Sequence, residues 1–406
     1  IFILLSLYHP YFLFFGVLLL FALYFIFKFS YNDGLETSLK ESKYKYKVAS
    51  WLQELARNNF SFRNEHNFNF GLQKNDKLVS EYLYYREKHF NVIKKQFSQL
   101  IVFKVVITAS LLIIGGILVL SQEMNIGQFV AAEIVILLVI SSVEKIILGL
   151  ETLYDVLTSI EKIGQVTDLD LEKEYESNTE KKYLSKINLE VQNLSFQFPG
   201  SQTYALKDIS LQIKQGEQIF VSGKNGSGKT TLLRTLSGLL EPKTGTFFIN
   251  DDTFTKINLM EYRNRIGSIV HGETLFEGTI YENLNFGQPI ANEENLKWAL
   301  DGVQLTDFIK SLPEGLETAV FQEGRQLSAS NAQKILLARS ILHKPKILFY
   351  EDPTDVIDDK IAKQIIDFIT NPINKWTVLV SSKNQYWKTK CNREIQLKNG
   401  TIILDK

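Results

Sequence analysis

The chain has 406 residues, of which 45% are hydrophobic, and its 45 basic and 45 acidic side chains give a formal net charge of zero. This length allows two or three domains, and the charge balance gives no general argument for a nucleic-acid partner. The single cysteine, Cys391, excludes intramolecular disulfides and cysteine-rich metal sites, which suits a reducing compartment.

The first 29 residues are almost entirely apolar and aromatic, with an interruption at His9-Pro10. Residues 11–29 have the length of a complete membrane span, whereas residues 1–8 are too few to cross a bilayer. We therefore interpret residues 1–8 as part of a truncated span, and we expect that the natural N-terminus is missing. A cleaved signal peptide is the alternative, but the segment has no basic start and no small-residue cleavage site.

Residues 31–99 are charged and helix-forming, and their many lysines are typical of a cytoplasmic loop. Within this segment, residues 48–60 carry apolar side chains at helical spacing, which predicts a short amphipathic helix that joins two long ones. The alternative is a solvated coiled-coil face without a partner.

Residues 101–121 and 129–150 are two further predicted spans. The loop between them contains no Lys or Arg, and neither does the turn at His9-Pro10, so both are expected on the outer side of the membrane. Glu133 lies in the last span. It is either a residue that faces a pathway through the membrane or an interfacial carboxylate near the outer end.

The pattern changes after the last span. A partial transmembrane domain with cytoplasmic helical extensions is predicted over residues 1–160, followed by a charged linker over residues 161–185. From residue 186 to residue 406, strands, turns and helices alternate, which indicates a soluble α/β domain.

A glycine-rich segment in this domain has the spacing of a phosphate-binding P-loop, with a predicted strand before it and a predicted helix after it. Its glycines let consecutive N–H groups surround phosphate oxygens, and the helix N-terminus adds partial positive charge. Lys229 is expected to reach the β- and γ-phosphates, Thr230 to ligate Mg²⁺, and Thr231 to donate to the α-phosphate. The alternative is a glycine-rich turn that merely starts a helix. The predicted nucleotide-binding residues of this loop are Gly223, Lys224, Asn225, Gly226, Ser227, Gly228, Lys229, Thr230 and Thr231.

The run at residues 347–350 is apolar or aromatic and is followed by Glu351 and Asp352. This is the form of a buried parallel strand that delivers carboxylates to its C-terminal edge. Alone, it could equally be a core strand that ends in two solvated acids. Together with the P-loop it predicts an α/β ATPase domain that binds ATP and Mg²⁺.

The order of spans, cytoplasmic helices, linker and P-loop domain resembles the half-transporter of an ABC exporter, and the resemblance covers nearly the whole chain. It implies a multi-domain membrane protein, in which an all-α transmembrane domain precedes an α/β P-loop NTPase domain. It also implies that residues 48–60 are a coupling helix that docks on a soluble domain of the dimer. Further motif positions of the family fall on Phe198 (the adenine-stacking aromatic), His271 (the Q-loop glutamine), Ser328 (in the signature, as Leu327-Ser328-Ala329-Ser330-Asn331), Asp355 to Asp358 (the D-loop) and Lys383 (the switch histidine).

The departures from the family pattern concern hydrolysis. Glu351 then Asp352 replace Asp then Glu, so the expected Mg²⁺ ligand and the expected water-polarising acid each have the wrong length. A misplacement of on the order of 1 Å can cost about 10²-fold in rate. Lys383 and His271 replace the usual histidine and glutamine, and Ala329-Ser330 replaces a pair of glycines. We therefore expect ATP binding to be retained and ATP hydrolysis to be attenuated. The alternative is that a site with this relaxed consensus still hydrolyses ATP.

The function implied by the resemblance is that of an ATP-binding subunit that couples ATP binding and hydrolysis to export of an unknown substrate. The alternative is a hydrolysis-deficient regulatory or structural half of a heterodimeric exporter. Either function implies a second half-transporter, which forms a homodimer or a heterodimer with this chain. Either also implies an integral protein of the inner or plasma membrane, with the ATP-binding domain in the cytoplasm. A soluble ABC ATPase is disfavoured, because the spans and the P-loop lie on one chain, and no nucleic-acid partner is expected. Asp352, Lys383 and His271 are the expected catalytic residues, and Thr230 and Glu351 the expected metal ligands.

Overall fold

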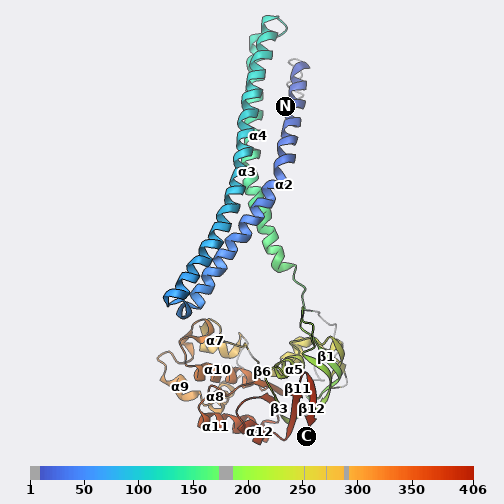
Figure 1. The fold of residues 1–406 in the computed structure, drawn as a ribbon, viewed down its shortest axis with the longest axis vertical. Helices are drawn as coiled ribbons and strands as arrows, with labels where there is room; N and C mark the ends of the chain where they lie inside the picture. The colour runs from blue at the N-terminus through green and yellow to red at the C-terminus, as the bar shows by residue number, and fades with distance from the viewer. Residues whose placement is uncertain (1–9, 173–185, 251, 271, 288–291) are drawn as a thin grey trace. The chain divides into compact units, whose positions relative to one another are not determined.

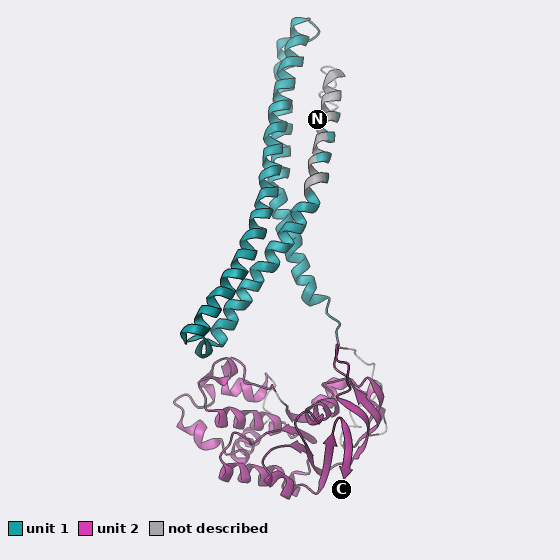
Figure 2. Ribbon diagram, in the orientation of Figure 1, with its two compact units in different colours: residues 1–171 teal, residues 172–406 magenta. Residues whose placement is uncertain are grey.

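The computed structural model describes residues 10–172, 186–250, 252–270, 272–287 and 292–406. The chain divides into two compact units, residues 1–171 and residues 172–406, which are coloured separately in Figure 2. The first unit is helical and the second is built from strands and helices (Figure 1). The expected order of an all-α region followed by an α/β domain is therefore confirmed.

Long helices make up the first unit: α2 (Pro10–Arg57), α3 (Glu65–Leu120) and α4 (Ile126–Thr167), with a short 3₁₀ turn, η1 (Asn59–Phe62), between α2 and α3. Asn64 caps α3 by accepting from the N–H of Asn67, and Asn125 forms a capping box with Gln128 at the start of α4. Within the described residues, α3 and α4 each contain a stretch long and apolar enough to cross a membrane. The predicted spans 101–121 and 129–150 fall in these two helices and span 11–29 falls in α2, whereas residues 1–8 lie outside the described residues.

The interface between α3 and α4 has helical periodicity. Leu100, Phe103, Ile107 and Leu111 recur every three or four residues on one face of α3 and pack against Ile136, Ile140, Val143 and Ile147 of α4. The apolar side chains between them are exposed in the isolated chain, as expected for helices that meet lipid or other helices.

The structure differs from the sequence prediction in two places, the end of α2 and the end of α4. Residues 48–57 are not a separate amphipathic helix but the last turns of α2, because no Gly or Pro breaks them and Trp51 is anchored by donating from Nε1 to the Gly71 carbonyl at 3.3 Å. The chain turns only at Asn58, which follows α2. Residues 161–167 of the predicted linker are likewise about the last two turns of α4, and residues 173–185 lie outside the described residues.

The second unit is organised around a sheet of strand order β12-β11-β3-β10-β9-β6, in which all neighbours are parallel except β11 and β12. These strands are β3 (Gln218–Gly223), β6 (Ile266–Ile269), β9 (Ile347–Glu351), β10 (Thr377–Ser381), β11 (Arg393–Lys398) and β12 (Thr401–Asp405). An antiparallel sheet of order β2-β1-β4-β5 contains β1 (Leu189–Phe196), β2 (Leu206–Ile213), β4 (Thr244–Ile249) and β5 (Asp252–Thr253), and β7 (Gly278–Thr279) pairs with β8 (Ala319–Val320).

Helices and short 3₁₀ turns connect these strands. They are α5 (Lys229–Leu236), η3 (Phe254–Lys256), α6 (Leu259–Arg263), α7 (Ile280–Asn285), α8 (Glu293–Gly302), α9 (Thr306–Ser311), η4 (Gly315–Glu317), η5 (Gln322–Gly324), α10 (Ala329–Leu342), α11 (Asp359–Ile369), η6 (Pro372–Asn374) and α12 (Tyr386–Lys390). Helix α10 begins at Ala329, because Ser328 caps it by accepting from the N–H of Asn331.

Both faces of the parallel sheet are buried. In β9, Ile347 and Phe349 pack into the hydrophobic core shared with α5, whereas Leu348 and Tyr350 pack into the core shared with α10 and α11. Alternate side chains of a strand point to opposite faces, so a strand covered on both sides needs an unbroken apolar run. The acids Glu351 and Asp352 follow this run at the edge of the sheet where β3 also ends.

Candidate nucleotide site

The P-loop connects the C-terminal end of β3 to α5 and depends on its glycines. Gly223 has φ 145°, and a Cβ there would lie 2.5 Å from the Leu397 carbonyl oxygen. Gly228 has φ 103°, and its Cβ would lie 2.7 Å from the Ala205 carbonyl oxygen. Neither position accepts a side chain without displacing backbone. No side chain therefore covers the loop at these two positions, and a ligand can approach its N–H groups.

Lys229 and Thr230 begin α5 and reach the two sides of the loop. The Lys229 ammonium donates to the carbonyl oxygens of Gly223 and Lys224, at 2.9 and 3.0 Å, and therefore lies over the loop. The Thr230 hydroxyl donates to Oε1 of Glu351, the last residue of β9. The structure thus brings together the two residues expected to ligate Mg²⁺, although they are 121 positions apart in the sequence.

Asp352 is fixed between β9 and β10. It adopts a left-handed conformation, with φ 46°, and its N–H donates to the Ser381 carbonyl at 2.7 Å. Its carboxylate accepts from the N–H of Lys383 at 3.2 Å, so the contact with Lys383 uses the backbone rather than the ammonium. The Lys383 side chain is exposed.

The surroundings of Asp352 favour its protonated form. Partial burial raises the pKa of the Asp352 carboxyl first, the neighbouring Asp355 carboxylate raises it further, and Lys383 opposes the change. Asp355 in turn accepts a hydrogen bond of 2.7 Å from the Ser382 hydroxyl. Sequence reasoning placed Asp355 in the D-loop but missed its effect on Asp352; the available signal was a third acid only three positions after Asp352.

The other expected site residues occupy separate positions. Phe198 follows β1 and is 42% exposed, and its ring meets Phe196 edge-on with centroids 4.9 Å apart. Ser328 is exposed and caps α10. His271 lies outside the described residues. The described contacts therefore link the P-loop with the ends of β9 and β10, and no described contact links Phe198 or Ser328 to that group.

The arrangement at the P-loop fits a nucleotide phosphate group and a hard cation. The hydroxyl of Ser227, whose side chain is buried, has no hydrogen-bond partner among the described residues, which leaves a donor inside the loop. Within the described part of the chain, no cluster of three His, Cys, Asp or Glu side chains forms a self-sufficient metal site. Thr230 and Glu351 supply the oxygen ligands that Mg²⁺ prefers, and Mg²⁺ ordinarily completes its shell with phosphate and water oxygens.

Comparison with known proteins identifies this domain. A sequence profile of the family described as ABC transporter matches residues 206–355, from β2 to the segment after β9. The second unit is an ABC transporter domain. The match includes the P-loop and the acids Glu351 and Asp352, but ends before Lys383.

Relatives carry the same domain together with a permease region. The chain is 32% identical over 237 residues to ATP-dependent permease MDL1 of Candida albicans, a match that covers 56% of this chain and 34% of the permease. It is 27% identical over 318 residues to the putative multidrug export ATP-binding/permease protein YgaD of Bacillus subtilis, covering 78% of this chain and 54% of that protein. The matches therefore span only about a third to a half of the length of these relatives.

The fold of the chain matches that of a solved exporter. A bacterial Atm1-family ABC exporter with ATP bound superposes with a TM-score of 0.85 and 17% sequence identity, covering 96% of this chain and 68% of that one. At this identity the likeness concerns the fold. The chain therefore has the fold of an ABC exporter half, with helices α2 to α4 preceding the ABC transporter domain.

Proposed function

We propose that this chain is the ATP-binding half of an ABC-type membrane transporter, in which ATP binding and hydrolysis drive the export of a substrate. The observation that carries the proposal is the hydrogen bond from Thr230 to Glu351, which joins the two proposed metal ligands; Thr230 directly follows Lys229 in the P-loop. The long apolar helices α3 and α4 on the same chain support an integral membrane protein of the inner or plasma membrane, with the ABC transporter domain in the cytoplasm.

In the proposed site, each residue has a separate task. The Lys229 ammonium exchanges the carbonyl oxygens of Gly223 and Lys224 for the β- and γ-phosphates, while the loop N–H groups and Thr231 bind phosphate oxygens. Thr230 and Glu351 hold Mg²⁺, which when bound offsets the negative charge of the phosphates. Phe198 stacks on the adenine, and Ser328 contacts nucleotide held by a second half-transporter. Asp352 orients the attacking water, and Lys383 and His271 contact the γ-phosphate side.

The test is binding of a fluorescent ATP analogue with Mg²⁺ to the purified full chain. Lys229→Ala removes the ammonium from the phosphates, and we expect the affinity to fall by roughly tenfold or more, since charge-assisted hydrogen bonds contribute about 1.5–3 kcal/mol. Lys360→Ala, which removes an exposed cation at the start of α11, is the matched control and is expected to bind as the parent does. Equal affinity of the Lys229→Ala variant and the parent would exclude the P-loop as the nucleotide site.

A second candidate is a half-transporter that binds ATP but hydrolyses it slowly. It is favoured by Asp352, whose short side chain is held by the Lys383 N–H and whose pKa is raised by burial and by Asp355. The test compares phosphate release by the parent with that of the double variant Asp352→Glu, Lys383→His. A marked gain in the double variant supports the second candidate. A parent that already turns over at ordinary rates, together with a double variant that is no faster, rules it out.

A further inference from the structure

A basic hollow of about 340 Å³ lies in the ABC transporter domain, away from the nucleotide site. Lysines Lys344, Lys346 and Lys375 and tryptophans Trp298 and Trp376 line it, and no acidic side chain is among its described lining residues. The chain as a whole has no net charge, so this grouping of cations around aromatic rings is a local feature.

The position of the basic hollow follows from the topology of the parallel sheet. Lys346 directly precedes β9 and Trp376 directly precedes β10, so the hollow lies where these strands begin. The P-loop follows the end of β3, which is parallel to β10, and β10 is parallel to β9. The hollow therefore lies at the N-terminal ends of the parallel strands, and the nucleotide site lies at their C-terminal ends. The proposed ATP chemistry does not use the hollow.

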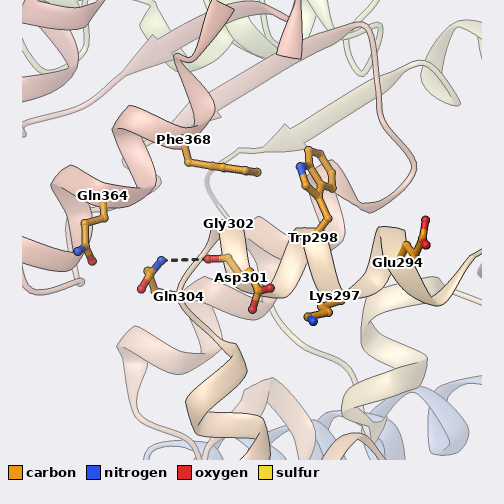
Figure 3. A pocket seen from close by; sticks show the side chains of 8 residues that line it. All are labelled: Glu294, Lys297, Trp298, Asp301, Gly302, Gln304, Gln364 and Phe368. Carbon is orange, nitrogen blue, oxygen red and sulfur yellow. Dashed lines mark hydrogen bonds between the residues drawn. The ribbon is translucent and has the colours of Figure 1, made fainter. Parts of the chain in front are cut away.

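The aromatic wall of the basic hollow is held by packing. The Trp298 ring contacts Trp376 with centroids 5.8 Å apart and Phe368 with centroids 5.4 Å apart. Trp376 is buried, and Phe368 lies so close to Gly302 that a Cβ there would be 2.3 Å from its ring. Figure 3 shows Trp298 and Phe368 pointing toward one another at a neighbouring pocket that shares Trp298. Trp298 is thus a fixed apolar surface between the two pockets.

The cations of the basic hollow have no carboxylate partner among the described residues. Lys344 lies with Nζ 5.4 Å from the centroid of the Trp298 ring, and neither Lys346 nor Lys375 forms an ion pair in the described part of the chain. Lys344 and Lys375 also adopt left-handed conformations, with φ 50° and 54°. A glycine holds this conformation more easily, so local backbone preference does not explain these two lysines.

We propose that the basic hollow binds an acidic peptide segment, which inserts an apolar or aromatic side chain against Trp298 and places its carboxylates on Lys344, Lys346 and Lys375. Charge complementarity selects acidic residues, and the half-buried Trp298 ring selects an apolar one between them. Ile373, which is 83% exposed beside the hollow, extends the apolar surface along a peptide. A nucleic-acid strand fits less well, because it needs a basic groove that follows several phosphates rather than one hollow.

The experiment measures fluorescence anisotropy of labelled peptides with the full-length chain in detergent. The probe is the heptapeptide EEEFEEE, and EEEGEEE and QQQFQQQ are controls that lack the aromatic ring and the charges. We expect the probe to bind at least about tenfold more tightly than either control, and its binding to weaken as salt is raised. Equal binding of EEEFEEE and EEEGEEE, stronger competition by inorganic polyphosphate than by unlabelled EEEFEEE, or no binding of EEEFEEE, overturns the proposal.

The matched variants separate loss of the basic hollow from loss of the fold. Lys344→Gly with Lys375→Gly removes two cations where glycine suits the backbone, so we expect unchanged or higher thermal stability and at least about fivefold weaker binding. Lys310→Gln with Lys360→Gln removes the same charge at exposed positions elsewhere in the domain and is expected to bind as the parent does. Binding that is equally weak in both double variants, or unchanged in the first, rules the hollow out as the site.

Discussion

The Ser382 hydroxyl donates a hydrogen bond of 2.7 Å to the Asp355 carboxylate and so ties the segment after β10 to the segment after β9. Two backbone contacts run beside it, from the Asp352 N–H to the Ser381 carbonyl and from the Lys383 N–H to the Asp352 carboxylate. The proposed water-polarising acid is therefore held on one side by the backbone of β10, and it has a second carboxylate on the other.

The rate of ATP hydrolysis is expected to depend on pH through Asp352. Burial and then Asp355 raise the pKa of Asp352, so this carboxyl stays protonated at pH values where an ordinary aspartate is ionised. The protonated form cannot accept a proton from water, and the rate must rise with pH through the raised pKa. Asp355→Asn removes the like charge, lowers the pKa of Asp352 and shifts the acid limb of the profile toward lower pH.

The measurement is the maximal rate of phosphate release against pH at saturating Mg-ATP. Asp358→Asn is the control, because it removes an acid three positions later while an asparagine still caps α11 by accepting from the Lys360 N–H. The argument fails if the profile of Asp355→Asn coincides with those of the parent and the control.

Two glycines of the P-loop have different steric surroundings. Both Gly223 and Gly226 have positive φ, at 145° and 77°, so alanine strains either by about 1 kcal/mol. At Gly223 the new Cβ also meets the Leu397 carbonyl at 2.5 Å, whereas at Gly226 it meets nothing within 4 Å. In the absence of nucleotide, we expect Gly226→Ala to lower the melting temperature of the domain by about 2–4 °C and Gly223→Ala by at least twice as much.

That difference is measured by tryptophan fluorescence of the full chain during heating. Similar melting temperatures of the two alanine variants would show that β11 moves aside, and that the close approach of Gly223 to Leu397 does not hold the loop.

The acid-bearing strand was predictable from sequence, because its environment dictates its composition. Residues 347–350 are an unbroken apolar run, which a strand needs when helices cover both faces of its sheet, and the structure buries all four. Such a strand delivers the residues that follow it to the C-terminal edge of the sheet. The position of Glu351 near the P-loop therefore followed from the pattern alone.

The contacts between loops were not predictable in the same way. Ser382 and Asp355 are 27 positions apart on two connections, and no periodicity relates them. The left-handed conformation of Asp352 depends on its hydrogen bond to Ser381, which is a tertiary contact. The error at residues 48–57 has a similar origin. Apolar side chains at helical spacing suggested a separate short helix, but helix α2 continues because no Gly or Pro breaks it and Trp51 donates to the Gly71 carbonyl.

The ion pair between Lys104 of α3 and Glu144 of α4 joins two apolar helices, with 2.5 Å between Nζ and Oε2. In a membrane, a single unpaired charge is costly, about 2.5–3.5 kcal/mol at the centre of a spanning helix. We therefore expect Lys104→Met and Glu144→Gln each to lower the yield and thermal stability of the full chain in detergent, while the double variant recovers most of the loss. Additive losses in the double variant would contradict an energetic role for the pair.

Adjacent glycines of α3 provide a test of how α3 and α4 pack. A Cβ added to Gly115 would lie 2.3 Å from the Phe129 ring, whereas a Cβ added to Gly116 would meet no atom within 4 Å. Small residues allow helices and large side chains to approach closely inside a membrane, so Gly115→Ala must displace Phe129. We expect Gly115→Ala to lower the melting temperature of the full chain, and Gly116→Ala to leave it unchanged or raise it slightly, since alanine favours a helix by about 1 kcal/mol. The readout is thermal aggregation in detergent. Equal stability of the two variants, or a loss confined to Gly116→Ala, would mean that the contact of Gly115 with Phe129 does not hold α3 against α4.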